Sequence, residues 1–272
     1  MQATEFQAAF QSNDEERDDG YAKTRAMALN LAKWTYTSAG ALGVKTSQND
    51  CVWWRVPGGS SIYLGAVIVD GQRDNDAILS EMTAVLAAWG SESFHLYDCW
   101  ATRDLSPLGF ERLWTNPWYL RPPLDRQPLK EAASAIANGL TIEVVATAEE
   151  LAEFEQASWQ GFESEGETPE PTSWHAPATL EDPGMYYLIA RVQGQVVAST
   201  IVYASEGMAG IYGISTLPHF RGRGYASALT RASLSLRPDL PMSVYPDPDS
   251  LPIYSRIGFE RAGEIAVWQR TA

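Results

Sequence analysis

A short run of glycines and arginines in the second half of the sequence could bind phosphate groups. The apolar stretch GISTLPHF leads into Arg221-Gly222-Arg223-Gly224-Tyr225-Ala226, and a helical pattern starts at once. Glycines let backbone amides approach a ligand, and the first amides of a helix have no partner inside it and lie at the positive end of its dipole. This arrangement suits phosphate or pyrophosphate. A structural turn between strand and helix is an alternative, and so is a dinucleotide-binding fingerprint, which would need a third glycine near Ser227.

Two motifs in this half resemble the GNAT superfamily of N-acetyltransferases. The pyrophosphate loop of that family has Gln or Arg, two variable residues, Gly, one variable residue, and Gly or Ala. Arg221, Gly224 and Ala226 match it in register, after a similar apolar strand with a Pro and an aromatic residue. The later signature of the family, a Tyr on a short helix followed by Gly-Phe, is similar to the segment from Tyr254 to Phe259. The resemblance covers residues 141–272.

The resemblance implies a co-substrate, a reaction and roles for single residues. The co-substrate would be acetyl-CoA and the acceptor an amine. Tyr254 would donate a proton to the leaving thiolate, with packing beside the cofactor as its alternative role. Backbone groups of one strand would bind the pantetheine arm, and the loop amides would bind the pyrophosphate. The implied cofactor-binding residues are Ile214, Thr216, Arg221, Gly222, Arg223, Gly224, Tyr225, Ala226 and Ser227.

Two departures from the family pattern leave a second function open. Asp247 stands where many members have an Asn that bonds the cofactor, and the segment AGIYGISTL contains no Glu where many members keep a base. Tyr212, acting through a water, and His219 are conceivable bases, but neither is assigned. The leading function is therefore an acetyltransferase, and the alternative is a non-catalytic acetyl-CoA-binding sensor or interaction module.

The elements that would position these residues form an α/β (α+β) pattern. A Pro-rich, polar segment, PPLDRQPLK, separates two halves of mixed strands and helices, and the boundary is placed between residues 135 and 136. In the second half the patterns predict a strand at 141–148, a helix at 146–162, a hairpin of strands at 185–193 and 195–205, a strand at 209–217 and a helix at 224–236. They then predict a strand at 241–246, a short helix at 250–258 and a final strand or pair of strands at 259–270.

The two halves also resemble each other. Gly109-Phe110-Glu111-Arg112 recurs as Gly258-Phe259-Glu260-Arg261, and Tyr97 aligns with Tyr245, each at the end of a predicted strand. In the first half, the segment that aligns with the arginine-containing loop is residues 70–76, whose three carboxylates would repel a pyrophosphate. We therefore expect two GNAT-like domains, each a mixed, mostly antiparallel sheet flanked by helices. Residues 1–135 would be a degenerate domain without the acetyl-CoA loop, and residues 136–272 the acetyltransferase domain.

Acidic residues gather where the family fold borders its acceptor pocket. From Glu143 to Glu170 there are nine glutamates and no basic residue. They run along the predicted helix at 146–162, where Leu151, Phe154 and Phe162 share one face, and into a polar loop. A cationic small molecule or peptide amine would be drawn to such a surface. A solvated helix face is the simpler explanation.

Composition excludes several other classes of protein. The chain of 272 residues carries 20 Lys and Arg against 34 Asp and Glu, which leaves no basic stripe for nucleic acid. No apolar run reaches the roughly 18 residues of a membrane helix, and the first residues do not read as a secretory signal. Cys51 and Cys99 are expected to be free thiols of a cytoplasmic protein. His95, His175 and His219 lack metal-ligand spacing. The oligomeric state stays open.

Overall fold

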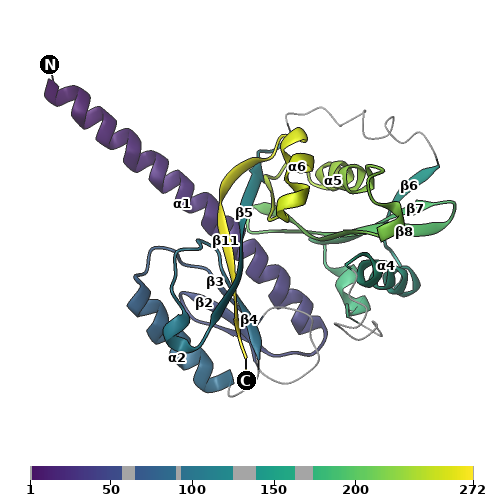
Figure 1. The fold of residues 1–272 in the computed structure, drawn as a ribbon, viewed down its shortest axis with the longest axis horizontal. Coiled ribbons are helices and arrows are strands. Elements are labelled where there is room, and N and C mark those ends of the chain that lie inside the picture. The colour runs from purple at the N-terminus through teal and green to yellow at the C-terminus, as the bar shows by residue number, and fades with distance from the viewer. Residues whose placement is uncertain (1, 57–64, 90–92, 125–138, 163–173, 272) are drawn as a thin grey trace.

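The computed structural model describes the whole chain except residues 1, 57–64, 90–92, 125–138, 163–173 and 272 (Figure 1). The first part of the chain contains α1 (Gln2–Ala41), β1 (Thr46–Gln48), β2 (Val52–Arg55), β3 (Ala66–Ile68), α2 (Asn75–Trp89), β4 (Phe94–Asp98), the 3-10 turn η1 (Ser106–Leu108) and β5 (Glu111–Arg121).

The second part is richer in strands. It contains β6 (Leu140–Val144), α4 (Ala148–Gly161), η2 (Pro177–Glu181), β7 (Met185–Val192), β8 (Gln195–Ser205), β9 (Met208–Thr216), η3 (Pro218–Phe220), α5 (Tyr225–Leu236), β10 (Met242–Val244), η4 (Pro248–Ser250), α6 (Leu251–Arg256) and β11 (Glu260–Arg270).

All the described strands join one mixed sheet of eleven strands, in the order β1-β2-β3-β4-β11-β5-β10-β9-β8-β7-β6. Among these described strands, only β3 with β4 and β9 with β10 pair in parallel. Each parallel pair is connected through a helix, α2 or α5, because parallel neighbours need a crossover. The predicted mixed α/β class, mostly antiparallel with flanking helices, is confirmed.

The last strands of the two parts exchange places at the centre of the sheet. β11 lies between β4 and β5, and β5 in turn pairs with β10. The tetrapeptides that repeat in the sequence therefore begin two neighbouring strands, which pair antiparallel from Glu260 opposite Leu120 to Gln269 opposite Glu111. The predicted boundary at 135/136 lies outside the described residues, and strands from its two sides alternate in the sheet.

Helices cover both faces of this sheet. On one face α2 packs over the first part, with Ile78 and Met82 in its core, while α5 and α6 pack over the second part. On the other face α1 contributes Met27 and Leu31 to a core shared with β3, β8, β9 and β11. Figure 1 shows α1 crossing the molecule and extending beyond it at its N-terminal end. One helix of the first part thus packs on strands of both parts.

The helices, strands and turns predicted for the second half occur near their expected positions, with one local error. Leu151 and Phe154 of α4 are buried as predicted, but Phe162 is 52% exposed. The helix ends at Gly161, so Phe162 no longer follows the helical period. The capping box of Thr147 and Glu150 fixes its beginning.

Three sequence expectations about the chemistry of the chain can be compared with the described residues. Cys51 and Cys99 are both free and buried. Among the described residues, no three His, Cys, Asp or Glu side chains form a group that could hold a metal ion. None of the described helices combines the length and the apolar character needed to cross a membrane.

Candidate functional site

The site begins where β9 and β10 separate. These parallel strands pair only at Ala209 with Met242 and at Gly210 with Ser243. β9 then continues to Thr216, whereas β10 ends at Val244. A bulge at Gly213, whose φ is +57°, bends β9 within this stretch and shifts its register with β8. In the part of the chain that the structure describes, the second half of β9 therefore has no strand on its β10 side.

Ile214 and Thr216 present their backbone to this open edge. The amide of Leu217 donates to the carbonyl of Val197 on β8 at 2.9 Å, so residues 215 and 217 share the β8 side. Because backbone groups alternate along a strand, those of Ile214 and Thr216 lie on the opposite side. The Thr216 carbonyl also accepts a hydrogen bond from Arg221 Nε at 3.2 Å. The two residues thus lie at the edge where the sequence placed a pantetheine arm.

The predicted phosphate loop connects this strand to α5. Gly222 and Gly224 have φ of +75° and +84°, a backbone region that glycine adopts without strain. Gly224 is the N-cap of α5 and makes no side-chain cap, so the first amides of the helix are left to other partners. Residues 221–224 are exposed and residues 225–227 are half-buried. The loop therefore offers accessible amides at the positive end of a helix.

The two arginines of the loop are held by backbone carbonyls. Arg221 Nη2 donates to the Gly161 carbonyl of α4 at 2.9 Å. Arg223 Nη2 donates to the His219 carbonyl at 3.1 Å, and its guanidinium lies over the Phe220 ring, 5.1 Å from the ring centre. Their positive charges are therefore fixed beside the loop amides, which adds to the attraction for an anion.

The end of α4 approaches β9 closely enough to require glycine. A Cβ atom built on Gly161 would lie 2.6 Å from Ser215 Oγ and 3.3 Å from the Thr216 amide nitrogen. Ser215 Oγ is itself hydrogen-bonded to Ser199 Oγ at 2.9 Å. Gly161 therefore allows α4, β9 and Arg221 to meet at one point.

Tyr254 of α6 lies in the core that α6 shares with α5. Its side chain is 1% exposed and packs edge-on against Phe259, with ring centres 5.7 Å apart. Burial raises the pKa of the Tyr254 hydroxyl, the negative charge of Asp247 raises it further, and a hydrogen bond with Thr230 opposes this. The Thr230 hydroxyl donates to the Ala226 carbonyl at 2.8 Å, so the contact reaches the first turn of α5. Tyr254 is thus a protonated group next to the loop helix.

A residue of the first part binds the end of the helix that carries this tyrosine. Arg121 on β5 donates from Nε to the Ile257 carbonyl at 2.9 Å, at the C-terminal end of α6. A basic side chain is favourable there because the last carbonyls of a helix lack partners. The sequence did not indicate this contact, which depends on the exchange of β5 and β11.

Tyr212, one of the conceivable bases, is engaged elsewhere. Its hydroxyl donates to Asn30 Oδ1 of α1 at 2.5 Å, and its ring stacks on Trp34 at 4.2 Å. Burial raises the pKa of Tyr212 well above its usual value. A group that keeps its proton in this way is a poor base. His219 is exposed on the rim of the loop. Asn30 and Trp34 were missed by sequence reasoning, although their spacing of four residues places both on one helix face.

The described part of the acidic stretch is largely committed to structural contacts. Glu143 and Glu153 both form ion pairs with Arg191. Glu155 is buried and binds the His175 backbone amide and, at 3.1 Å, Nδ1 of the same residue. The glutamates at 163, 165, 167 and 170 lie outside the described residues. An acidic acceptor surface therefore depends on those four positions.

In the corresponding loop of the first part, residues 70–76, a carboxylate of the loop caps the start of α2. Asp74 Oδ1 accepts the Ala77 amide of α2 at 2.7 Å. Asp70 Oδ1 accepts the hydroxyl of Tyr21 at 3.0 Å. Arg73 lies between the carboxylates of Asp50 and Asp70. The start of α2 is therefore already capped by a carboxylate of its own loop, in contrast to the loop before α5.

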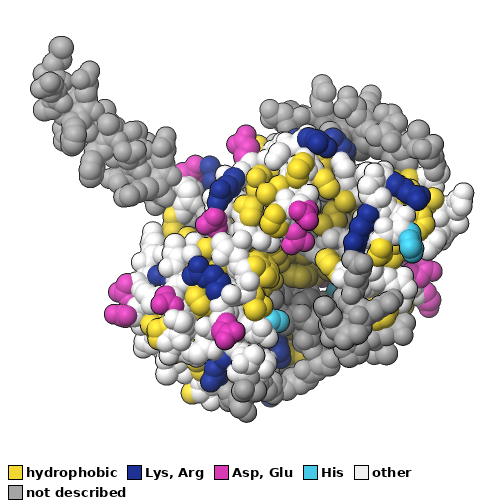
Figure 2. Space-filling model, in the orientation of Figure 1, with side chains coloured by type: hydrophobic (Ala, Val, Ile, Leu, Met, Phe, Trp, Pro, Cys, Tyr) yellow, Lys and Arg dark blue, Asp and Glu magenta, His cyan; other side chains and the backbone are white. Residues whose placement is uncertain are grey.

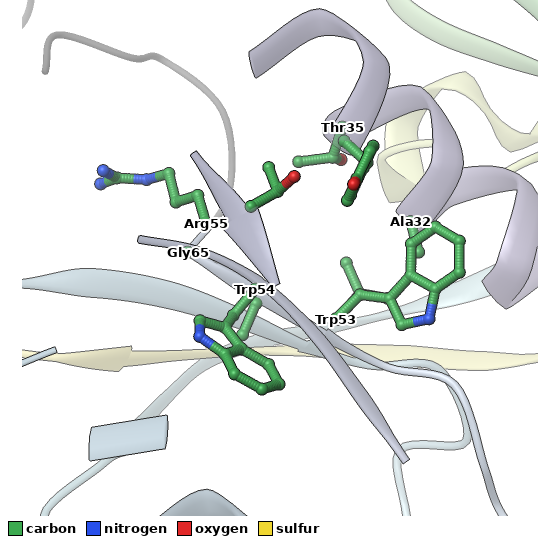
Figure 3. A pocket seen from close by; sticks show the side chains of 10 residues that line it. Ala32, Thr35, Trp53, Trp54, Arg55 and Gly65 are labelled. Carbon is green, nitrogen blue, oxygen red and sulfur yellow. The ribbon is translucent and has the colours of Figure 1, made fainter. Parts of the chain in front are cut away.

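A small pocket of the first part lies between α1 and β2 (Figure 3). The Trp53 indole lies under α1 beside Ala32, while Trp54 points to the other face of the strand and Arg55 points away. The ten residues that line it contain no carboxylate, histidine or cysteine. It therefore offers no group suited to acid–base or nucleophilic chemistry at neutral pH.

Comparison with known proteins identifies the second half of this arrangement. Residues 148–259 match the model of the acetyltransferase (GNAT) family. This segment contains the loop before α5, the open edge of β9 and Tyr254. Residues 148–259 are therefore similar to a GNAT acetyltransferase domain, and the enzyme class predicted from the sequence, an acetyltransferase, is confirmed. No curated protein sequence gave a significant match.

Similar solved structures cover both halves of the chain. A GCN5-related N-acetyltransferase from Kribbella flavida aligns with a TM-score of 0.62 and 18% identity, over 89% of this chain and 96% of its own. A GCN5-related N-acetyltransferase-like protein from Streptococcus suis aligns with a TM-score of 0.55 and 16% identity, over 92% and 99%. A GCN5-related N-acetyltransferase from Sphaerobacter thermophilus aligns with a TM-score of 0.51 and 14% identity, over 90% and 93%. At these identities the likeness establishes the fold.

Proposed function

We propose that the protein transfers an acetyl group from acetyl-CoA to an amine, at a site formed by residues 136–272. The observation that carries this proposal is the loop at residues 221–227, exposed at 221–224, which leads from the open edge of β9 into α5. A pyrophosphate bound at the loop would direct the pantetheine arm along the edge at Thr216 and Ile214. The thioester would then lie near the point where β9 and β10 separate.

The chemistry of the residues present fits this ligand. The backbone amides of Gly222 to Ser227 would hold the pyrophosphate, and Arg221 and Arg223 contribute charge beside them. The amide and carbonyl of Ile214 and the amide of Thr216 would bond the arm as an added strand does. The Thr216 carbonyl already accepts a hydrogen bond from Arg221.

Tyr254 is the proposed general acid of the reaction. The neutral amine nitrogen forms a bond to the thioester carbonyl carbon, and the bond from that carbon to sulfur then breaks. The sulfur leaves as a thiolate and takes the hydroxyl proton of Tyr254, while the new amide loses its extra proton to solvent. Burial raises the pKa of Tyr254, so its hydroxyl is protonated at neutral pH, which is the form that this role requires.

We also propose that the two halves arose by duplication and that the first half does not bind the cofactor. The order of three strands, a helix and a parallel strand occurs in both parts, as β1-β2-β3-α2-β4 and as β7-β8-β9-α5-β10. Asp74 occupies the start of α2 that an anion would need. The short turn η1 stands where the second half has α6 and Tyr254.

The acidic segment would draw a cationic amine toward the acceptor side. We expect the combined variant Glu163→Gln, Glu165→Gln, Glu167→Gln and Glu170→Gln to raise KM for such an amine, with KM for acetyl-CoA unchanged. The measurement is steady-state acetylation at low and high salt, since screening should reduce the difference. An unchanged KM at low salt would remove the acidic segment from the proposal.

Two matched glycine variants test the cofactor site. Gly224 and Gly194 both have φ near +84°, are exposed and leave open space for a Cβ atom. Gly224→Ala and Gly194→Ala should therefore suffer similar backbone strain, but only Gly224→Ala should weaken acetyl-CoA binding, about tenfold by titration calorimetry. Equal affinities in the two variants would contradict the loop assignment.

An amine panel then separates the enzyme from a non-catalytic acetyl-CoA sensor. Acetyl transfer to at least one amine, reduced by Tyr254→Phe, supports the enzyme. Binding of acetyl-CoA without transfer to any amine would favour the sensor. Failure to bind acetyl-CoA would contradict both functions.

A further inference from the structure

Five aromatic side chains surround the place where β9 and β10 separate. They come from five different segments of the chain, and three of them belong to the first half. The cluster, called the aromatic wall below, consists of Trp34 of α1, Tyr97 of β4, Trp114 of β5, Tyr212 of β9 and Tyr245 just after β10.

Ring contacts connect all five side chains. Trp34 stacks on Tyr212 with ring centres 4.2 Å apart and planes 3° from parallel. Tyr212 lies 6.3 Å from Tyr245, which stacks on Trp114 at 6.4 Å. Tyr97 meets both Trp114 and Tyr245 edge-on at 5.9 Å. Aromatic pairs at these distances are favourable and hold each other in place.

The wall is accessible in part. Trp34, Trp114 and Tyr245 are half-buried, while Tyr97 and Tyr212 are buried. Figure 2 shows a hollow between the two parts of the molecule, with hydrophobic side chains along it. Tyr212 and Tyr245 stand two residues beyond the last paired positions of β9 and β10, at the start of the gap between the strands. A thioester carbonyl held at that gap would therefore be within reach of a molecule bound on the wall.

The wall is electrically neutral at physiological pH. Burial raises the pKa of Tyr97 to about 12 and raises the pKa values of Tyr212 and Tyr245 well above their usual value. Among the described residues, the groups that shift these three pKa values are other tyrosines and Cys99, with no carboxylate or basic side chain. None of these groups is a counter-ion for an ammonium group, and desolvation would favour the neutral amine.

The neutrality of the aromatic wall offers a way to deprotonate the amine without an assigned general base. A primary aliphatic amine has a pKa near 10 in water and is almost fully protonated at pH 7, so it must lose a proton before it can attack. A desolvating apolar surface lowers the pKa of a bound amine, which increases the neutral fraction without a dedicated side chain. A flat ring attached to the amine would stack on the indoles and phenols, whereas a thin aliphatic chain would cover less of the wall.

We propose that the acceptor is a primary amine on a flat aromatic body, bound on the aromatic wall, and that Trp34 and Trp114 of the first half determine this specificity. The inference rests on the proposed acetyl transfer and names its substrate class. The acidic segment would act earlier and at longer range, on the protonated form in solution. The first half would thus contribute substrate contacts in place of a second cofactor site.

The test compares amines of similar basicity and different shape. Tryptamine and 2-phenylethylamine are measured against n-hexylamine and spermidine, with kcat/KM as the readout. We expect the aromatic amines to be preferred about tenfold or more. Trp34→Leu and Trp114→Leu should each reduce the preference severalfold and leave the dissociation constant for acetyl-CoA unchanged. Trp114→Phe, which retains a flat ring, should keep most of the preference for aromatic amines.

Trp54→Leu is the matched control. Trp54 is also half-buried, but it packs against the core on the other face of the sheet. The variant Trp54→Leu should leave the preference for aromatic amines unchanged. Circular dichroism should show that each variant is folded. Equal kcat/KM for aromatic and aliphatic amines, a preference for spermidine, or an equal loss in Trp54→Leu would overturn the proposal.

Binding distinguishes this inference from the proposed function. If acetyl-CoA binds and no amine is acetylated, the transferase proposal fails, and tryptamine is titrated against the acetyl-CoA complex by calorimetry. Binding that is weakened in Trp114→Leu and retained in Trp54→Leu would still support the aromatic site. Absence of tryptamine binding would overturn it.

Discussion

Burial raises the pKa of Tyr254 above that of an exposed tyrosine. Its hydroxyl retains the proton to higher pH because the phenolate would be desolvated and would face the charge of Asp247. We expect Tyr254→Phe to lower kcat about 10²- to 10⁴-fold, the usual contribution of a positioned acid, with little change in acetyl-CoA affinity. Steady-state kinetics and calorimetry measure the two quantities separately.

The pH dependence of the same residue has a defined sign. The active form is the protonated one, so activity would be lost as the pH rises through the pKa of Tyr254. Since that pKa is raised above its usual value near 10, Tyr254 should cause no loss of rate between pH 7 and about pH 10. A fall in kcat within that range that disappears in Tyr254→Phe would contradict the raised pKa.

Asp247 is the residue at which the chain departs from the family pattern, and the structure gives its charge a consequence. Asp247→Asn should lower the pKa of Tyr254 by removing a nearby negative charge, and it should tighten acetyl-CoA binding about two- to fivefold at low salt. Asp249→Asn is the control, because Asp249 is exposed on the same turn but is not among the groups that shift the pKa of Tyr254. Equal effects of the two variants would point to net charge alone.

At the scale of elements, α4 packs against β9 through one glycine, Gly161. Gly161→Ala should lower the free energy of unfolding by about 1–3 kcal/mol, because its Cβ would overlap Ser215 against the backbone of β9. It should also raise KM for acetyl-CoA, since Arg221 binds the Gly161 carbonyl. The stability change is measured by urea denaturation.

Gly20→Ala provides the comparison for that change. Gly20 lies in α1, is exposed and has no atom within 4 Å of a built Cβ. Alanine should there stabilise the helix by roughly 0.5–1 kcal/mol through its higher helix propensity. Destabilisation of similar size at both positions would rule out the packing explanation for Gly161.

The local elements of the second half could be predicted because their signals lie within short stretches of sequence. The hairpin of β7 and β8, the helix α5 and the Tyr254 helix follow from periodicity and turn residues. The end of α4 could not be predicted from the sequence, because Phe162 continues the apolar pattern while the helix ends one residue earlier. The role of Asn30 and Trp34 also escaped prediction, since their partners are more than 170 residues away.

At the scale of the whole molecule, the exchange of β5 and β11 could not be read from the sequence. The shared GFER tetrapeptide indicated a repeat, but two separate sheets would satisfy the same apolar patterns. The choice between them depends on pairings across long sequence separations, such as Val267 with Trp114. The aromatic wall depends on the same pairings, because they bring Trp114 and Tyr97 beside Tyr245.

The exchange of strands predicts that neither half is stable alone. Without residues 136–272, β4 and β5 would lose the strand between them, and the buried Ile265, Val267 and Trp268 of β11 would no longer cover the first part. Without residues 1–135, β10 would lose β5, and α1 would no longer cover β8 and β9. We therefore expect each half, expressed alone, to be insoluble or to show no cooperative thermal transition.

Co-expression of the two halves should restore a soluble complex that elutes as one species and melts in one transition, because strand pairing across the cut needs no covalent connection. Two soluble halves with separate transitions would show that the sheet is divisible. In that case the acceptor contacts of the first half would also have to be tested on the isolated second half, which should acetylate aliphatic and aromatic amines equally.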